Sequence, residues 1–275
     1  RDCACIRRGS RGRRGTELFA SETVAMGREE NKIRVSERIR TIVGLILILS
    51  VGFALRLADF DDPPLDFHGT RQLRSLILAR DFYLQTRQDT DADLAARSRD
   101  LSQLEAYEPP ILERLIAFVY RLMDAEDWRV GRLLSSLFWV CGSVFIALAA
   151  WRISSIAGAA GSVLILMFFP MSVIMSRSIQ PDPWMCAWLM AAIWAGLRWA
   201  EDGRKRDILM TAVFGGVSIL VKAFAGFFIA GLLAGVLAAR LSRDGWVRSL
   251  LTVMSVGLAA VAPTVIYALF LGSER

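Results

Sequence analysis

Residues 133–151 read LLSSLFWVCGSVFIALAAW, a run of nineteen residues without a charged side chain. At a rise of about 1.5 Å per residue, a helix of this length covers most of the roughly 30 Å hydrocarbon core of a bilayer. The whole chain is 54% hydrophobic over 275 residues, with its apolar residues clustered in runs. Seven runs are candidate spans, at residues 41–57, 132–152, 155–175, 183–200, 207–221, 223–240 and 248–271. The sequence therefore predicts an all-α integral membrane protein, a polytopic helical bundle of about seven spans.

The fifth and sixth of these spans are separated only by Lys222 within the apolar stretch 208–239. One helix over this stretch would be about 48 Å long, well beyond the hydrocarbon thickness. We therefore expect two shorter helices that meet near Lys222 and Gly226, in preference to one long tilted helix.

The net charge of +6 is a property that many nucleic-acid-binding proteins share, but here the basic residues are distributed unevenly about the spans. The short connections on one side hold Arg204, Lys205, Arg206, Arg243 and Arg248, and those on the other side only Arg177 and Lys222. Basic residues gather on the cytoplasmic side of membrane proteins. We expect no nucleic-acid partner but a multi-pass protein of the cell membrane, with a basic cytoplasmic tail (1–40), an outer loop (58–131), six further spans (132–271) and an outer C-terminal end (272–275).

The start of the chain and its cysteines suggest little chemistry. Residues 1–25 are basic and lack the apolar segment of a secretory signal, so we expect Met26 to be the natural start and the preceding residues to be disordered. Cys3 and Cys5 lie in this tail, whereas Cys141 and Cys186 lie in apolar runs. No Cys-x-x-Cys motif occurs, so neither a zinc site nor a disulfide framework is predicted.

The outer loop has helical patterns of its own. Residues 70–84 carry apolar side chains at helical spacing, with Thr70 as the expected N-cap, and residues 94–104 predict a second, weaker helix. After Pro109 and Pro110, residues 111–123 predict an amphipathic helix that lies in the membrane interface.

Four polar clusters fall on the outer side in this topology: residues 59–71, residues 107–110, residues 177–182 and Lys222. Each has a purely structural interpretation. The two aspartates before Pro63 suit a solvated turn, Asp66 with His68 and Arg71 suits a helix cap, and Asp182 suits a helix dipole. A lysine among thirty apolar residues is costly unless it meets an anion or reaches the interface. Their convergence on one face fits a site for a lipid-linked phosphate donor, in which cations neutralise phosphate and a carboxylate acts as general base.

Several of these motifs together resemble a known family. They are DFHGTRQ at 66–72, LARDFY at 78–83, EPP at 108–110, DWRVGRL at 127–133, SRSIQPD at 176–182 and GVSILVKA at 216–223. In this order they resemble membrane glycosyltransferases of the GT-C superfamily, in glycosyltransferase family 39, the protein mannosyltransferase and aminoarabinose transferase group. Members are usually longer, so we expect this chain to be an N-terminal portion that is inactive alone if acceptor recognition lies elsewhere.

The resemblance implies an inverting transfer of a sugar from a polyprenyl-phosphate donor to a lipid, glycan or protein acceptor outside the cytoplasm. It implies a catalytic Asp in the first outer loop, but His68 stands at the spacing from Arg71 where that Asp would fall. We expect Asp66 to be the base with His68 assisting. Asp182 would order the site, and Lys222 and Arg177 would face the donor phosphate. Glu108 would line the acceptor or donor pocket, and Arg71 would also bind substrate.

Two other functions remain open from sequence. A transporter is one, although transporters place polar groups near mid-membrane and often contain inverted repeats, and no repeat is evident here. A non-catalytic assembly subunit that docks partners on its outer loop is the other. A divalent metal bound by the carboxylates is conceivable chemistry, but no ligand spacing in the sequence supports one, so we predict no metal site and no cofactor beyond the donor.

Overall fold

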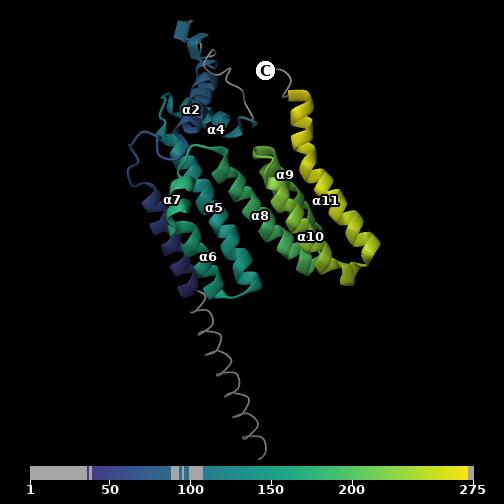
Figure 1. The fold of residues 1–275 in the computed structure, drawn as a ribbon. Coiled ribbons are helices and arrows are strands. Elements are labelled where there is room, and N and C mark those ends of the chain that lie inside the picture. Colours follow the sequence, from purple (N-terminus) through teal and green to yellow (C-terminus); the bar gives the residue numbers. More distant parts are fainter. Residues whose placement is uncertain (1–35, 37–38, 88–92, 95, 99–107, 272–275) are drawn as a thin grey trace, which may run out of the picture. The chain divides into compact units, whose positions relative to one another are not determined.

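The computed structural model describes residues 36, 39–87, 93–94, 96–98 and 108–271. Within these ranges the chain is helical and contains no strand (Figure 1). It divides into two units, residues 1–47 and 48–275. In the first unit the described residues are residue 36 and the beginning of the helix Ile39–Arg56. Most of the predicted basic tail, most of the predicted helix at 94–104 and the C-terminal end 272–275 lie outside the described residues.

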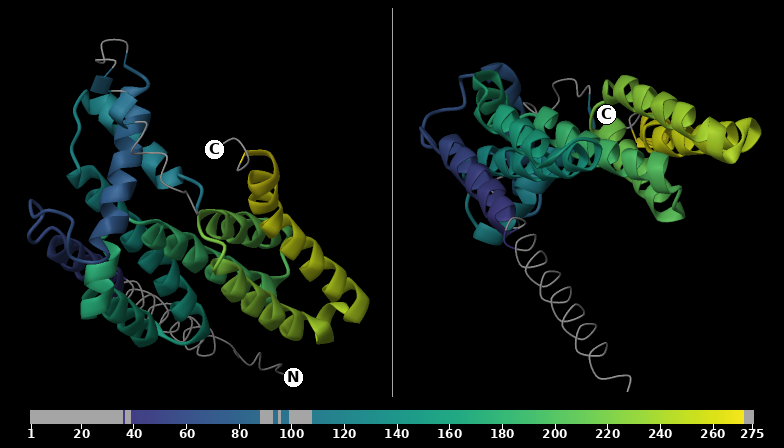
Figure 2. Two further views of the ribbon diagram at one scale, coloured as in Figure 1. Left: turned by 45° about the horizontal axis from the view of Figure 1, so that its top comes forward. Right: turned by 90° about the horizontal axis from the view of Figure 1, so that it is seen from below.

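The second unit contains the remaining elements. They are α2 (Gly69–Leu84), α4 (Ile111–Met123), α5 (Arg129–Ile153), α6 (Ile156–Phe168), α7 (Pro170–Ser176), α8 (Pro181–Asp202), α9 (Lys205–Val221), α10 (Ala225–Asp244), α11 (Trp246–Ile266) and the short π-helix η1 (Tyr267–Leu271). Helices α5 and α8–α11 run up and down beside one another, and α2 and α4 pack together at one end of them (Figures 1 and 2).

The helices confirm the predicted fold class, an all-α membrane protein. Four of them are long and apolar enough to cross a bilayer: Ile39–Arg56, Arg129–Ile153, Ala225–Asp244 and Trp246–Phe270. The pair α6 and α7 together makes a fifth candidate. Helices α8 and α9 occupy the predicted positions of the fourth and fifth spans but are not among these candidates. The count of seven crossings therefore stays a prediction.

The predicted break at Lys222 is confirmed, because α9 ends at Val221 and α10 begins at Ala225. A second break, inside the predicted span 155–175, was not expected. There α6 and α7 meet at an angle of 64°. Pro170 begins α7 and has no N–H to bond to the carbonyl of Leu166, four residues earlier.

Two side chains from other helices satisfy the carbonyl that Pro170 leaves open. The Leu166 oxygen accepts a hydrogen bond from Nε1 of Trp139 at 2.9 Å and from Arg56 at 3.2 Å. The fully buried Arg56 also donates to the Met167 carbonyl at 3.0 Å and to the Ser176 hydroxyl at 2.6 Å. This single arginine thus fixes the end of the first helix to both sides of the α6–α7 break.

Close helix contact within the bundle depends on small residues. At Gly142 of α5, a Cβ atom would lie 2.8 Å from Sδ of Met190 and 2.9 Å from Cα of Ala187 on α8. Backbone atoms cannot move aside as a flexible side chain can, so only glycine allows α5 and α8 this approach.

In the loop, α2 begins one residue before the prediction, and Thr70 is not its N-cap. His68 occupies that position with a left-handed backbone (φ 50°) and no side-chain capping bond. Helix α4 has the predicted bounds. Its buried face, which includes Leu112, Ile116 and Tyr120, packs on α2 through Ala79 and Tyr83. The opposite face exposes Phe118 and Leu122, and its place in the membrane interface stays a prediction.

Candidate functional site

The predicted site residues come from four separate places in the chain. Asp66 and His68 lie just before α2, Arg71 lies in its first turn, and Glu108 lies just before the two prolines that precede α4. Arg177 and Asp182 lie in the α7–α8 turn and at the start of α8, and Lys222 lies in the α9–α10 break. The structure brings these segments together at one end of the bundle, where they form two adjoining charged clusters.

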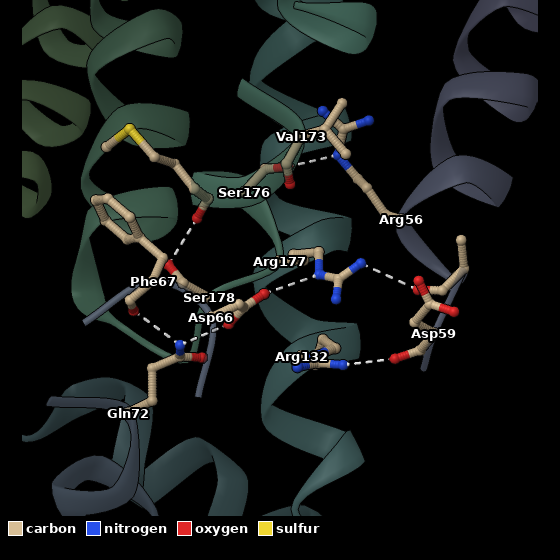
Figure 3. Close-up of polar contacts among 12 residues, drawn as sticks. Arg56, Asp59, Asp66, Phe67, Gln72, Arg132, Val173, Ser176, Arg177 and Ser178 are labelled. Atoms are coloured by element: carbon tan, nitrogen blue, oxygen red, sulfur yellow. Dashed lines mark hydrogen bonds and ion pairs between the residues drawn. The ribbon is translucent and has the colours of Figure 1, made fainter. Parts of the chain in front are cut away.

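The first cluster surrounds Asp66 (Figure 3). Nε of Arg177 lies 3.2 Å from one carboxylate oxygen of Asp66, and Nε2 of Gln72 donates to the other at 3.0 Å. Arg177 also donates to the carbonyl of Ala58 at 3.0 Å, which ties the turn to the end of the first helix. Asp66 is therefore held by one cation and one neutral donor, while part of its carboxylate stays accessible to solvent.

Opposing effects determine the acidity of Asp66. Partial burial raises its pKa, because the charged form loses hydration. The hydrogen bonds from Gln72 and the Phe67 backbone lower the pKa, and so do the positive charges of Arg177 and Arg132. The lowering effects prevail, and the pKa lies below the ordinary value of 3.8. Asp66 is a carboxylate throughout the neutral range.

The second cluster surrounds Lys222. Its Nζ atom lies 2.7 Å from Oδ1 of Asp182 and 3.9 Å from Oε1 of Glu108. Glu108 in turn accepts from the guanidinium of Arg71 at 3.0 Å and 3.2 Å. Four predicted residues thus form one chain of alternating charge, in which two cations share two carboxylates.

Two neutral amide side chains connect the segments that carry the clusters. Gln72 donates to Asp66 and to the Phe67 carbonyl at 2.8 Å, while its own oxygen accepts from the Ile179 backbone at 2.9 Å. Gln180 donates to the same Phe67 carbonyl at 3.0 Å. Gln72 and Gln180 are both buried. They fix the start of α2 against the turn that carries Arg177 and Asp182.

Local sequence explains where the second cluster forms. Pro181 is at the first position of α8, where its missing N–H costs nothing, and Asp182 follows in the first turn, favoured by the helix dipole. Lys222 is the C-cap of α9 with an extended backbone, which directs the chain away from the helix. The second oxygen of Asp182 is buried without a hydrogen bond within the described part of the chain.

His68 lies apart from both clusters. Its exposed ring makes an edge contact with Phe67, with ring centroids 4.4 Å apart. Within the described residues, the ring forms no hydrogen bond to Asp66. Its backbone carbonyl accepts from the amides of Arg71 and Gln72 and so starts α2.

Arg132 was not predicted as a site residue, although it lies in one of the family-like motifs. It is fully buried at the start of α5, donates to the Asp59 carbonyl at 2.9 Å and lies over the ring of Trp128. Its Nε and Nη2 atoms have no hydrogen-bond partner among the described residues. A charged side chain in an apolar helix is costly unless it has a role. Arg132, at the start of an uncharged run, could therefore have been predicted as a site residue from the sequence.

Glu113 was also missed, because it looks like one polar position of an amphipathic helix. It is buried and accepts from the Ser75 hydroxyl at 2.7 Å. Burial raises its pKa above the ordinary 4.5, the Ser75 hydrogen bond lowers it in part, and the charge of Glu108 raises it again. Glu113 lines a small pocket together with Arg71, Arg74, Glu108 and Gln180.

Within the described residues, no group of three His, Cys, Asp or Glu side chains is arranged to hold a metal ion. The charged groups of the site are arranged instead as cation–carboxylate pairs, with the buried charge of Arg132 beside them. Such an arrangement can bind an anion and accept a proton.

Comparison with known proteins identifies a family that the chain resembles. Residues 107–267 match the family model of dolichyl-phosphate-mannose-protein mannosyltransferases. The matched range contains Glu108, Arg177, Asp182 and Lys222, whereas Asp66, His68 and Arg71 precede it. No curated protein and no solved structure matches the chain. Because the family model covers more than half of the sequence, the chain belongs to the dolichyl-phosphate-mannose-protein mannosyltransferase family, a family of membrane glycosyltransferases.

Proposed function

We propose that this protein transfers a sugar from a polyprenyl-phosphate donor to an acceptor on the outer face of the membrane, at the site formed by the two charged clusters. The family implies the type of donor. The observation that supports the site is the convergence on Lys222 of Asp182, at 2.7 Å, and Glu108, at 3.9 Å, beside the Asp66–Arg177 pair at 3.2 Å. Segments more than one hundred residues apart in sequence contribute to it.

The reaction needs two kinds of help that these residues supply. The acceptor oxygen forms a bond to the anomeric carbon while the bond from that carbon to the phosphate oxygen breaks, and the acceptor proton must leave. Asp66 takes this proton as general base. The phosphate leaves with an additional negative charge, which Arg177 stabilises directly and the buried positive charge of Arg132 stabilises from behind it.

The Asp66–Arg177 pair connects donor binding with basicity. In the structure Arg177 and Arg132 help to hold the Asp66 pKa below its ordinary value, which makes Asp66 a weak base. A bound phosphate neutralises part of that positive charge. The pKa of Asp66 then rises, since its burial remains, and Asp66 becomes a stronger base once the donor is in place.

Because Lys222 is already paired with Asp182 and Glu108, we assign the second cluster to the acceptor side and not, as expected from the sequence, to the donor phosphate. Lys222 and Arg71 hold Glu108 and Asp182 in fixed positions, and Glu108 lines the pocket next to Arg71. The carboxylate of Glu108 can accept a hydrogen bond from a hydroxyl group that enters this pocket. The polyprenyl chain lies against apolar side chains that the helices expose, such as Leu164, Ile165 and Phe169.

A transfer assay tests the proposal. The full-length protein is reconstituted in liposomes with a labelled polyprenyl-phosphate mannose, the sugar being the one in the family's name. A mixture of membrane lipids, glycans and peptides is supplied as acceptors. We expect labelled product and free polyprenyl phosphate in equal amounts. A labelled nucleotide-linked mannose without lipid should give none. Label that stays on the lipid in all mixtures, or moves only from the nucleotide sugar, would contradict the proposal.

A further inference from the structure

A second pocket lies at the other end of the bundle, remote from the charged clusters. Helix α8 leads from Asp182 to Asp202, and α9 returns from Lys205 to Val221, so the pocket between them is a full helix length away from Lys222. This pocket has a volume of about 270 Å³, and its lining residues include Lys205, Arg240, Arg248, Ser249 and Thr252. It takes no part in the proposed transfer.

The pocket is basic. Arg240 is paired with Asp244, at 2.7 Å from its Nε atom. Lys205 and Arg248 also line the pocket and form no ion pair with any of the described residues. Three cations and one carboxylate leave an excess of positive charge, which favours an anionic ligand.

A buried hydroxyl provides an independent sign of a ligand. Ser249 is 3% exposed and lines the same pocket, but its Oγ atom has no hydrogen-bond partner within the described ranges. A serine in a helix commonly donates to the carbonyl four residues earlier, as Thr252 does to Arg248 at 2.8 Å. A buried polar group without a partner is costly. A ligand in the pocket would supply the missing hydrogen-bond partner of the Ser249 hydroxyl.

Backbone amides at two helix starts also favour an anion in this pocket. Helix α11 begins at Trp246 after Gly245, whose φ of 80° suits glycine, and no side chain caps it. Helix α9 begins at Lys205, also without a side-chain cap. The first amides of a helix lack internal partners and carry partial positive charge, which favours a bound anion. Both helix starts contribute residues to the pocket.

We propose that this pocket binds the phosphate group of an anionic membrane lipid. The volume fits a headgroup rather than a whole lipid, since sites for complete small molecules are about 300–1,000 Å³. Beside the pocket, α11 exposes Trp246, Val247 and Leu251, each by more than 60%. These apolar side chains can contact the acyl chains of a lipid, whereas free phosphate has no apolar part to contact them. Basic pockets between transmembrane helices are known to bind such headgroups.

Lipid binding by the full chain in detergent tests this proposal. Native mass spectrometry measures the dissociation constant for phosphatidylglycerol, with phosphatidylcholine as the zwitterionic comparison. We expect Arg248→Ala to weaken phosphatidylglycerol binding about tenfold or more, because it removes a charge-assisted contact. Ser249→Ala should weaken it about threefold. Lys205→Gln, an exposed position, gives a second charge variant with little risk to folding.

Arg206→Ala is the matched control, because Arg206 is an exposed cation beside Lys205 that does not line the pocket. It should leave the affinity within about twofold of the unchanged chain. Equal affinity for phosphatidylcholine would overturn the proposal. So would an equal loss in Arg206→Ala, or unchanged binding in Arg248→Ala and Lys205→Gln. Displacement of the lipid by inorganic phosphate at a comparable concentration would assign the site to free phosphate and overturn the lipid assignment.

Discussion

Nζ of Lys222 lies 2.7 Å from Oδ1 of Asp182, forty residues earlier in the chain. The pair joins the break between α9 and α10 to the first turn of α8, and both side chains are about one-fifth exposed. A lysine that interrupts an apolar stretch is thereby neutralised at a helix start. The same lysine reaches Glu108, and so connects the membrane bundle to the loop that carries Asp66 and Arg71.

Replacement of Lys222 by Met should destabilise the protein by about 1–3 kcal/mol, because Asp182 keeps a partly buried charge without its partner. Thermal unfolding in detergent measures the effect. Lys205→Met, at an exposed lysine without an ion pair among the described residues, is the control and should change little. The double variant with Asp182→Asn should recover part of the loss. Equal destabilisation by Lys222→Met and Lys205→Met would show that the pair does not matter.

Arg56→Met should cost about 3 kcal/mol or more of unfolding free energy. It removes hydrogen bonds to Ser176 and to the carbonyls of Leu166 and Met167 at the Pro170 break. Arg40→Met, an exposed arginine of the same helix, is the matched control. We expect the two variants to differ clearly in their unfolding temperatures, and an indistinguishable pair would refute the role given to Arg56.

Much of the candidate site could be predicted from the sequence, because an ionisable residue at the end of an apolar run must lie at the membrane surface or be paired with an opposite charge. Asp182 directly precedes one predicted span, and Lys222 separates two others. The predicted topology placed both residues on the same side of the membrane. The Lys222 break followed from helix length alone. The seven apolar runs likewise gave the helices in their observed order, although they did not decide how many cross the membrane.

Other features depend on tertiary contacts that the sequence does not reveal. Gln72 and Gln180 are ordinary polar residues in a local pattern, and only the packing of α2 against the α7–α8 turn buries them between the clusters. Glu113 is buried because α4 turns that face toward α2. The 64° bend at Pro170 was open to prediction from the proline itself, but the partners that stabilise it were not.

Glu113 should give the protein a specific pH dependence. Its pKa in the folded state is raised, so folding favours the protonated form. The stability that protonation contributes is present in full below the unfolded pKa, about 4.5, and is lost as the pH rises through the folded pKa. Glu113→Gln keeps an acceptor for Ser75 and carries no charge. Its unfolding free energy should equal or exceed that of the unchanged chain at neutral pH, with this part of the pH dependence removed.

Unfolding curves for the two proteins across about pH 4 to 8 provide the measurement. Glu126→Gln, at a partly exposed carboxylate paired with Arg80, is the control and should retain the pH dependence. A Glu113→Gln protein that follows the same pH curve as the unchanged chain would refute the assignment.

Gly142→Ala should destabilise the contact between α5 and α8 by about 1–3 kcal/mol, because the added methyl group meets the Ala187 backbone at 2.9 Å. Gly161→Ala in α6 is the matched control, since a Cβ atom there has nothing within 4 Å. That substitution should stabilise the helix by up to about 1 kcal/mol. Thermal unfolding of the two variants should shift in opposite directions, and a shift in the same direction would contradict the packing described.

The central claim is that Asp66 removes the acceptor proton, and the transfer rate of Asp66→Asn measures this most directly. Asp61→Asn is the control, because Asp61 lies in the same turn region but its side chain is 82% exposed and pairs with Arg129 outside the clusters. With the labelled polyprenyl-phosphate sugar varied up to saturation, we predict that Asp66→Asn lowers kcat by about 10² to 10⁴-fold and leaves the KM for the donor within a few-fold. Asp61→Asn should leave both unchanged. Transfer by Asp66→Asn at a rate close to that of Asp61→Asn would contradict the account.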